Sequence, residues 1–222
     1  RPADRTMPTS VEDSDRWYRT PRGAWIGGVE RRLVAGMAAR RAGESALDVG
    51  CGTGYFTEPL ARAGGTVVGV DRSLEALDHA RRHRGAGAMF VAADARSLPF
   101  PDRAFGLVIS ITALCFVDDE RAALAELLRV ARRRVVLGLL NRASVLHRTH
   151  GAGGGRGGYR GARWHTVGEA RALFDDLPAG SIDVRTAVAD PDGGAWARLL
   201  DRRRSARDGG RGAFIAVSAD RR

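Results

Sequence analysis

Lysine is missing from this sequence, so the 36 basic side chains are all arginines, and the net charge is +10. Such a charge raises the question of an anionic partner, either nucleic acid or an acidic metabolite. Arginine in place of lysine, with abundant glycine and alanine, is also what GC-rich codon usage produces without selection for binding. The arginine-dense segments 80–84, 131–135 and 201–205 are separate and mix with acids. We therefore interpret the charge as a solvated surface, with a nucleic-acid partner as the alternative.

Long apolar runs and cysteine pairs are missing too. The longest purely apolar stretches, such as residues 135–140, are far shorter than the roughly 18 residues that a bilayer requires. The first residues are polar and contain no apolar signal core, so we expect a cytoplasmic protein. Cys51 and Cys115 have no second pair or nearby histidine at ligand spacing. Neither a disulfide scaffold nor a metal site is expected.

Length and composition limit the number of domains. With 222 residues, 44% of them apolar, the chain can bury one sizeable core. We expect a single domain over residues 25–222 and an N-terminal arm over residues 1–24 that is partly disordered. Because the sequence starts with Arg1 and Met7 is a candidate start, we assign residues 1–15 no role in the fold.

Two hydrophobic periodicities alternate over residues 25–140. Helical spacing of Ile26, Val29 and Leu33 predicts an amphipathic helix over 25–41. Short apolar runs predict buried strands with helices between them. The expected strands are 45–50, 66–71, 88–94, 105–111 and 134–140, and the expected helices are 55–64, 73–83 and 119–133. This alternation predicts parallel strands joined by right-handed crossovers, hence a doubly wound α/β sheet.

Residues 141–222 are less regular. The glycine-rich segment 141–165 is expected to be a long mobile connection. After it we predict a helix over 166–174, a strand over 181–188, a helix around 195–203 and a final strand over 212–219. Two late strands without a regular crossover predict an antiparallel edge to the sheet.

The segment ALDVGCGTGYF (46–56) places three glycines at the end of the first predicted strand. Open α/β sheets bind ligands beyond the carboxyl ends of their strands, where glycines let backbone N–H groups approach closely. The phosphate loop of nucleotide hydrolases is excluded, because it requires four residues between glycines and then Lys and Ser or Thr. The dinucleotide fingerprint requires a glycine where this chain has Tyr55. A nicotinamide oxidoreductase is therefore a distant alternative.

Three aspartates accompany this loop. Asp48 precedes the glycines, while Asp71 and Asp94 end the second and third predicted strands. A carboxylate at the position of Asp71 can accept hydrogen bonds from ribose hydroxyls. Asp48 suits a ligand with a cationic amino-acid end, with capping of loop amides as the alternative. S-adenosylmethionine has an amino-acid end, a ribose, an adenine and a sulfonium, so we expect it as the cofactor.

In four motifs the sequence resembles the class I S-adenosylmethionine-dependent methyltransferases, and within them the bacterial type 11 group. The motifs LDVGCGTGYF, VVGVD, ADARSLPF and FGLVISITALCFVDD lie in register within residues 17–140. The resemblance implies a mostly parallel, seven-stranded Rossmann-like sheet with a reversed last strand. It implies that the loop glycines line the amino-acid portion, Asp71 holds the ribose, and Asp94 with Ala95 meets the adenine. The implied cofactor-binding set is Asp48, Gly50, Cys51, Gly52, Thr53, Gly54, Asp71, Arg72, Asp94, Ala95, Ser110 and Ile111.

The chain departs from the family pattern at two places. Gly106 stands where the family usually has Asp before the fourth strand. The turn before Val135 lacks the usual Pro-Gly-Gly, which predicts a shortened turn. Both positions lie away from the expected cofactor site, and they leave a noncatalytic relative as an alternative.

Several residues have a structural and a functional interpretation. Cys51 is expected to fit a crowded loop rather than to react. His79 and His83 are expected on an exposed helical face. The histidines around the connection (His147, His150 and His165) are expected at the surface, although a general base there is conceivable.

Two segments bear on the substrate side. Tyr18, with Trp17, lies on the N-terminal arm, which in the family often folds over the cofactor, so a lid is weighed equally with simple packing. Tyr18 and His165 are the two substrate-side candidates. The segment GGGRGGYRG (153–161) is expected to be a flexible loop, with RNA contact as the alternative.

The expected chemistry is an in-line displacement at a sulfonium. Such a reaction requires positioning and exclusion of water, rather than a nucleophilic residue or a metal. We therefore predict cofactor residues but no catalytic residue. A small-molecule methyl acceptor is expected, and an RNA-directed methyltransferase or a noncatalytic S-adenosylmethionine or RNA binder is the alternative. The sequence identifies neither the acceptor nor the oligomeric state.

Overall fold

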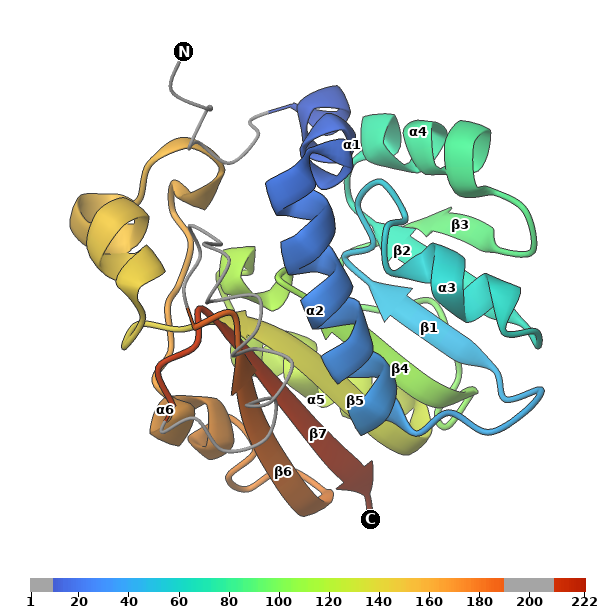
Figure 1. Cartoon of the computed structure of the whole chain (residues 1–222). Coiled ribbons are helices and arrows are strands. Elements are labelled where there is room, and N and C mark those ends of the chain that lie inside the picture. Colours follow the sequence, from blue (N-terminus) through green and yellow to red (C-terminus); the bar gives the residue numbers. More distant parts are fainter. Residues whose placement is uncertain (1–9, 190–209) are drawn as a thin grey trace.

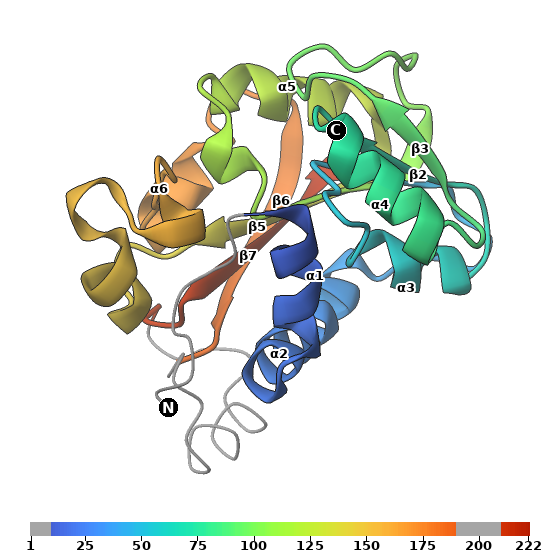
Figure 2. The ribbon, with the colours of Figure 1, turned by 90° about the horizontal axis from the view of Figure 1, so that it is seen from above.

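The computed structural model describes residues 10–189 and 210–222. These residues form a seven-stranded sheet with helices on both faces (Figures 1 and 2). Helices α2 (Pro21–Ala38) and α3 (Thr57–Arg62) cover one face, and α5 (Glu120–Val130) and α6 (Val167–Ala172) cover the other. Within the described ranges, no helix combines the length and apolar character needed to cross a membrane.

The sheet has the strand order β3-β2-β1-β4-β5-β7-β6. Its strands are β1 (Ala46–Val49), β2 (Val67–Asp71), β3 (Met89–Ala92), β4 (Phe105–Ile111), β5 (Ala131–Leu140), β6 (Ala179–Ala187) and β7 (Phe214–Arg221). The first five strands pair in parallel, and β7 is antiparallel to both β5 and β6. This arrangement confirms the predicted doubly wound sheet with a reversed last strand. The carboxyl ends of β1, β2 and β4 therefore meet at one edge.

The N-terminal region is more ordered than expected. Helix α1 (Val11–Arg19) begins after Ser10, whose side chain accepts a hydrogen bond from the Asp13 N–H. Helix α2 begins at Pro21, four residues earlier than predicted, because Thr20 caps it and proline suits the first helical turn. Asp15 is buried, with a relative exposure of 3%. The expectation that residues 1–15 have no role in the fold was therefore wrong for the residues after Thr9.

The boundary between α5 and β5 lies three residues earlier than predicted. The helix ends at Val130 and the strand begins at Ala131, so the three arginines of 132–134 belong to the strand and not to the helix. Extended backbone lets Arg133 pair with the buried Glu44 at 2.7 Å and Arg134 with Asp220 at 2.7 Å. A Cβ atom on Gly106 would lie 2.3 Å from the Glu44 Cγ. The departure from Asp at Gly106 therefore makes room for the Glu44–Arg133 ion pair.

The glycine-rich segment 141–165, predicted to be a long mobile connection, forms a series of short helical turns. It contains the π-helical turn η2 (His147–Gly151) and the 3₁₀ turns η3 (Ala152–Gly154) and η4 (Gly157–Tyr159). Tyr159 and Trp164 are buried, with ring centroids 5.4 Å apart. This aromatic packing offsets the backbone entropy of the glycines. The helix predicted around 195–203 lies outside the described residues.

Candidate functional site

A cavity of about 750 Å³ opens at the carboxyl ends of β1, β2 and β4. Ten of the twelve predicted cofactor residues line it: Asp48, Gly50, Cys51, Gly52, Thr53, Asp71, Arg72, Ala95, Ser110 and Ile111. Gly54 and Asp94 do not. Tyr18, predicted on the substrate side, lines it as well. Residues distant in the sequence thus converge at the sheet edge where the glycine loop was expected to bind its ligand.

The loop after β1 is held against the neighbouring strand. The backbone N–H groups of Gly50 and Cys51 both donate to the Val70 carbonyl, at 2.7 and 2.9 Å. Gly50 has a φ of +73°, and a Cβ atom there would lie 2.1 Å from the Ala113 Cβ. Both the backbone conformation and the close approach therefore require glycine. Cys51 is buried, and burial is the main cause that raises the pKa of its thiol, which agrees with a packing role.

Asp71 links the loop to the start of α4 (Leu74–Arg84). Its Oδ2 accepts from the Gly52 N–H at 2.8 Å, and its Oδ1 accepts from the Ser73 N–H at 2.9 Å. An ionised carboxylate offers about four acceptor positions, so these two bonds leave capacity for a diol. The residues present therefore fit the ribose of S-adenosylmethionine, the expected cofactor.

Asp48 lies below the loop and is almost fully buried. Its Oδ2 accepts a hydrogen bond from the Thr57 hydroxyl at 2.7 Å. Burial raises the pKa of Asp48 to about 7, the charge of Asp71 adds to this rise, and the Thr57 hydrogen bond opposes it. Asp48 thus lines the cavity while its carboxyl is anchored to α3. Thr57 was missed by the sequence reasoning, because a threonine at a helix start carries no distinctive motif.

Asp94 is not among the residues that line the cavity. Its two carboxylate oxygens accept hydrogen bonds from Arg96 at 3.0 and 2.7 Å, and Oδ1 also accepts from the Arg96 backbone N–H. These bonds lower the pKa of Asp94 well below its usual range. At this strand end the cavity is lined by the neighbouring Ala93 and Ala95 instead.

An aromatic stack joins α1, α2 and the glycine loop. The rings of Tyr18 and Tyr55 are nearly parallel, with centroids 3.6 Å apart. The Arg31 guanidinium lies 3.3 Å from the centroid of the Tyr55 ring, and it also donates to the Tyr55 carbonyl. Tyr55, which excluded a dinucleotide on sequence grounds, therefore anchors the N-terminal helices over the cavity.

A buried ion-pair cluster fastens α1 to α4. Asp15 pairs with Arg84 and with Arg19, the latter at 2.6 Å. Burial alone would raise the pKa of Asp15, but the Arg84 hydrogen bond and the nearby positive charges together lower it. The His79 imidazole is also buried, 3.8 Å from the Asp15 carboxylate. The prediction of an exposed His79 was wrong, since α1 covers it, whereas His83 is exposed as expected.

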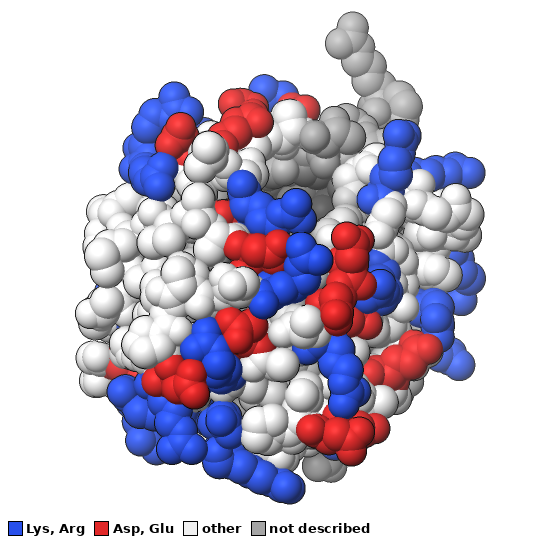
Figure 3. Space-filling view, turned by 180° about the vertical axis from the view of Figure 1, so that it is seen from behind, with Lys and Arg blue, Asp and Glu red and all other residues white. Residues whose placement is uncertain are grey.

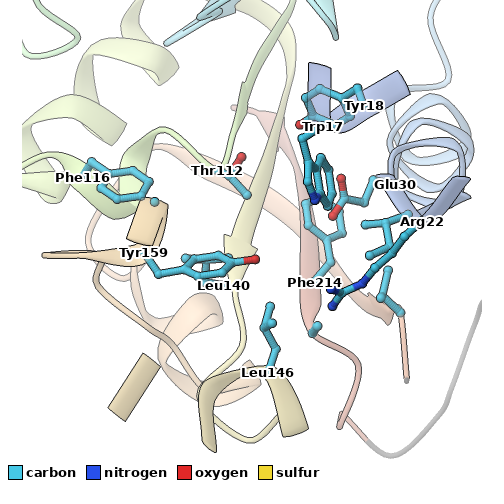
Figure 4. Close-up of a pocket in the computed structure, with 14 residues that line it drawn as sticks. Trp17, Tyr18, Arg22, Glu30, Thr112, Phe116, Leu140, Leu146, Tyr159 and Phe214 are labelled. Carbon is cyan, nitrogen blue, oxygen red and sulfur yellow. The ribbon is translucent and has the colours of Figure 1, made fainter. Parts of the chain in front are cut away.

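A second, smaller cavity of about 110 Å³ adjoins the first (Figure 4). Tyr18, Thr112 and Phe116 line both cavities. Thr112 has a φ of +53°, an unfavourable conformation for a branched residue, which marks a constrained position at the end of β4. The remaining walls come from α1, α2, β5, the 141–165 segment and residues near β7: Trp17, Arg22, Ile26, Glu30, Leu140, Leu146, Gly158, Tyr159, Val188, Ala213 and Phe214.

Glu30 is the one acid among the residues that line the smaller cavity. Burial raises its pKa to about 8. Sequence reasoning missed it, although a signal was present: Glu30 lies four residues after Ile26 and three before Leu33, inside the apolar stripe of α2. A lone acid in such a stripe must either find a partner or face a cavity.

The remaining histidine candidates lie outside both cavities. His165 is buried, contrary to the surface prediction, and its Nε2 lies 2.9 Å from the Glu120 Oε2. This pair ties the end of the 141–165 segment to α5 and gives His165 no contact with either cavity. His147 packs edge-on against Trp164, and the His150 Nδ1 lies 2.8 Å from the Thr149 hydroxyl.

Known proteins are similar to this chain in sequence. A family model described as "Methyltransferase domain" matches residues 47–137. An uncharacterised protein of Mycobacterium bovis is 32% identical over 229 residues, which cover 98% of this chain and 74% of that protein. A malonyl-[acyl-carrier protein] O-methyltransferase of Serratia marcescens is 39% identical over 161 residues, which cover 72% of this chain and 58% of that protein.

The fold is also similar to that of a solved structure. A SAM-dependent methyltransferase of Thermotoga maritima, described as a possible histamine N-methyltransferase, superposes with a TM-score of 0.75. The match covers 96% of each chain at 23% sequence identity. At this identity the likeness shows the fold alone.

Proposed function

Because the chain belongs to the S-adenosylmethionine-dependent methyltransferases, we propose that it methylates a small molecule bound in the smaller cavity. The cofactor of the family is S-adenosylmethionine, which supplies an electrophilic methyl group. We assign the larger cavity to this cofactor, with Asp71 toward the ribose and the glycine loop toward the amino-acid end. The site assignments rest on the residues that line the cavity.

One observation carries the small-molecule proposal. The smaller cavity adjoins the larger one and shares Tyr18, Thr112 and Phe116 with it. An acceptor seated there would meet the methyl group at this junction, with aromatic walls that exclude water. The volume of about 110 Å³ favours a small molecule, or the end group of a larger one.

The RNA alternative has weaker support. Basic and acidic side chains are intermixed over much of the face shown in Figure 3. Several arginines are also engaged in ion pairs, among them Arg84, Arg129 and Arg133. The arginine-containing turn around Tyr159 packs its ring inward against Trp164, so the aromatic group that would stack on a base is buried.

A turnover screen tests the proposal. Release of S-adenosylhomocysteine is measured with pools of small metabolites and, in parallel, with total RNA at low salt. We expect turnover with at least one metabolite pool. Turnover with RNA alone, and with no metabolite pool, would contradict a small-molecule acceptor.

A cavity-filling variant locates the acceptor. Leu146→Trp places a large side chain in the smaller cavity, whereas Val145→Trp places the same side chain at an exposed neighbouring position. We expect Leu146→Trp to lose turnover while it still binds S-adenosylhomocysteine, and Val145→Trp to keep both. Full turnover by Leu146→Trp would place the acceptor elsewhere.

A further inference from the structure

The Glu30 carboxylate is not paired with another described side chain. Within residues 10–189 and 210–222, no hydrogen bond or ion pair reaches it from another side chain. Three phenols lie close enough to be affected by its charge: those of Tyr18, Tyr55 and Tyr159. Burial is the main cause of the raised pKa of each phenol, and Glu30 adds to the rise. The carboxylate therefore lies among phenol rings, in a cavity that Arg22 lines as well.

The walls around this acid are aromatic. Trp17, Tyr18, Phe116, Tyr159 and Phe214 all line the smaller cavity. Figure 4 shows the Tyr159 hydroxyl directed across the cavity toward the side where Glu30 and Trp17 lie. Faces of aromatic rings attract cations, and the attraction grows when the cation is shielded from water.

We propose that the smaller cavity binds the amine group of a small apolar molecule, with Glu30 holding the ammonium and the aromatic rings packing around it. The proposal rests on the proposed function, and it names the acceptor class of that same site. The acceptor atom is then a nitrogen.

Other end groups fit less well. A carboxylate finds no opposite charge at Glu30, and the two groups repel each other whenever Glu30 is ionised. A neutral hydroxyl can donate one hydrogen bond, but it brings no positive charge that would stabilise the ionised form of Glu30. An ammonium donates hydrogen bonds to Glu30 and also stabilises its negative charge, because it carries a unit positive charge and three N–H donors.

Glu30 can also accept the proton that an ammonium must lose before its nitrogen is methylated. An ammonium nitrogen has no lone pair, so one proton moves from the nitrogen to the Glu30 carboxylate and leaves a neutral amine beside a neutral carboxylic acid. The nitrogen lone pair then forms the new N–C bond as the C–S bond breaks, and that electron pair stays on sulfur. The product is a methylated ammonium, and Glu30 returns its proton to water when the product leaves.

Three probes with one aromatic body separate these end groups. Phenethylamine, 2-phenylethanol and phenylacetate are titrated into the wild-type protein, with and without S-adenosylhomocysteine, and binding is followed by calorimetry. We expect phenethylamine to bind at least about tenfold more tightly than the other two, which corresponds to about 1.4 kcal/mol. Equal or tighter binding of the alcohol or the acid, or no binding of any probe, would overturn the amine assignment.

A matched pair of variants connects the preference to Glu30. Glu30→Gln removes the charge and keeps the shape, and Glu75→Gln makes the same change at an exposed position on α4 that lines neither cavity. We expect Glu30→Gln to lose the tenfold preference for the amine and Glu75→Gln to keep it. An unchanged preference in Glu30→Gln would show that Glu30 does not hold the amine.

The same samples separate this inference from the proposed function. S-adenosylhomocysteine binding by Glu30→Gln shows that the variant is folded. Turnover of an alcohol or an acid in the metabolite screen would leave a small-molecule methyltransferase in place and remove only the amine assignment. Turnover of RNA alone would remove both.

Discussion

The two cavities are adjacent, but the chain builds them in different ways. The larger one is made mainly by consecutive strand ends between Asp48 and Val117, where short motifs place backbone groups. The smaller one takes its lining from segments scattered along the chain between Trp17 and Phe214, each of which gives one to three residues. Backbone geometry requires glycines and acids at fixed spacing, so the larger cavity can be recognised as a motif in the sequence. Side chains that converge from distant segments leave none.

The largest expected effect lies in the larger cavity. Asp71→Ala removes both bonds that connect the carboxylate to the Gly52 and Ser73 N–H groups, as well as the proposed ribose contact. Charge-assisted hydrogen bonds contribute about 1.5–3 kcal/mol each, so we expect S-adenosylhomocysteine to bind about 100-fold more weakly. Calorimetry measures this directly.

A surface acid is the control for this change. Asp78 lies on the exposed side of α4 and pairs only with Arg81 among the described residues. Asp78→Ala should leave the affinity unchanged. Equal losses in both variants would mean that net charge, and not the Asp71 geometry, governs cofactor binding.

A smaller effect is expected at the border between the two cavities, where α1 supplies residues to both. Asp15→Ala leaves the poorly exposed Arg84 with Glu58, at 3.4 Å, as its one acidic partner among the described residues, beside its hydrogen bond to the Thr53 carbonyl. Loss of one partner of a buried ion pair costs about 3 kcal/mol at the low end of the usual range. We expect faster hydrogen exchange over α1, a lower melting temperature and several-fold weaker S-adenosylhomocysteine binding, if α1 acts as the proposed lid.

The exposed Asp13–Arg16 pair of the same helix offers the comparison. Surface pairs contribute less than about 1 kcal/mol, so Asp13→Ala should change none of these three quantities measurably. Faster exchange of α1 in Asp15→Ala with unchanged affinity would assign α1 a packing role and not a lid.

The smallest expected effect is a pH dependence that belongs to the smaller cavity. The pKa of Glu30 is raised by burial from 4.5 to about 8, so the folded protein holds this proton more tightly than the unfolded chain. Ionisation between these values favours unfolding, and the contribution of Glu30 to stability is lost as the pH rises from 4.5 to 8. The neighbouring phenols of Tyr18, Tyr55 and Tyr159 have raised pKa values and stay neutral in this window. The guanidinium groups of Arg22 and Arg31 lie near these phenols.

Glu30→Gln removes this titration. The melting temperature of the variant relative to wild type should therefore be higher at pH 8.5 than at pH 5.5, by about 3 °C or more. Thermal melts at the two pH values measure the difference, with Glu75→Gln as the variant that should show no such change. A difference that does not depend on pH would mean that Glu30 is already ionised near its ordinary pKa.

Much of the fold could be predicted because its periodicity is strong. The five parallel strands and the reversed edge follow from apolar runs and from the irregular end of the chain. Where the prediction failed, a distant partner decided the structure. Arg133 extends β5 toward Glu44, α1 folds because Asp15 reaches Arg84, and the 141–165 segment is ordered around Tyr159 and Trp164.

The residues of the candidate site also differ in how well the sequence predicts them. The glycine loop and Asp71 were predictable, because a strand end leaves few conformations for a backbone that must approach a ligand. Asp94 does not line the cavity, and its carboxylate is hydrogen-bonded to Arg96 two residues later. Glu30 was missed, because its proposed role depends on aromatic rings that come from distant segments of the chain.

The central claim is that separate residues determine binding of cofactor and acceptor. The most direct test is calorimetric titration of S-adenosylhomocysteine into wild type, Asp71→Ala and Glu30→Gln. We predict that wild type and Glu30→Gln bind with affinities within about threefold of each other, a difference below 1 kcal/mol, while Asp71→Ala binds about 100-fold more weakly. Absence of binding to wild type, or a loss in Glu30→Gln as large as that in Asp71→Ala, would contradict the claim.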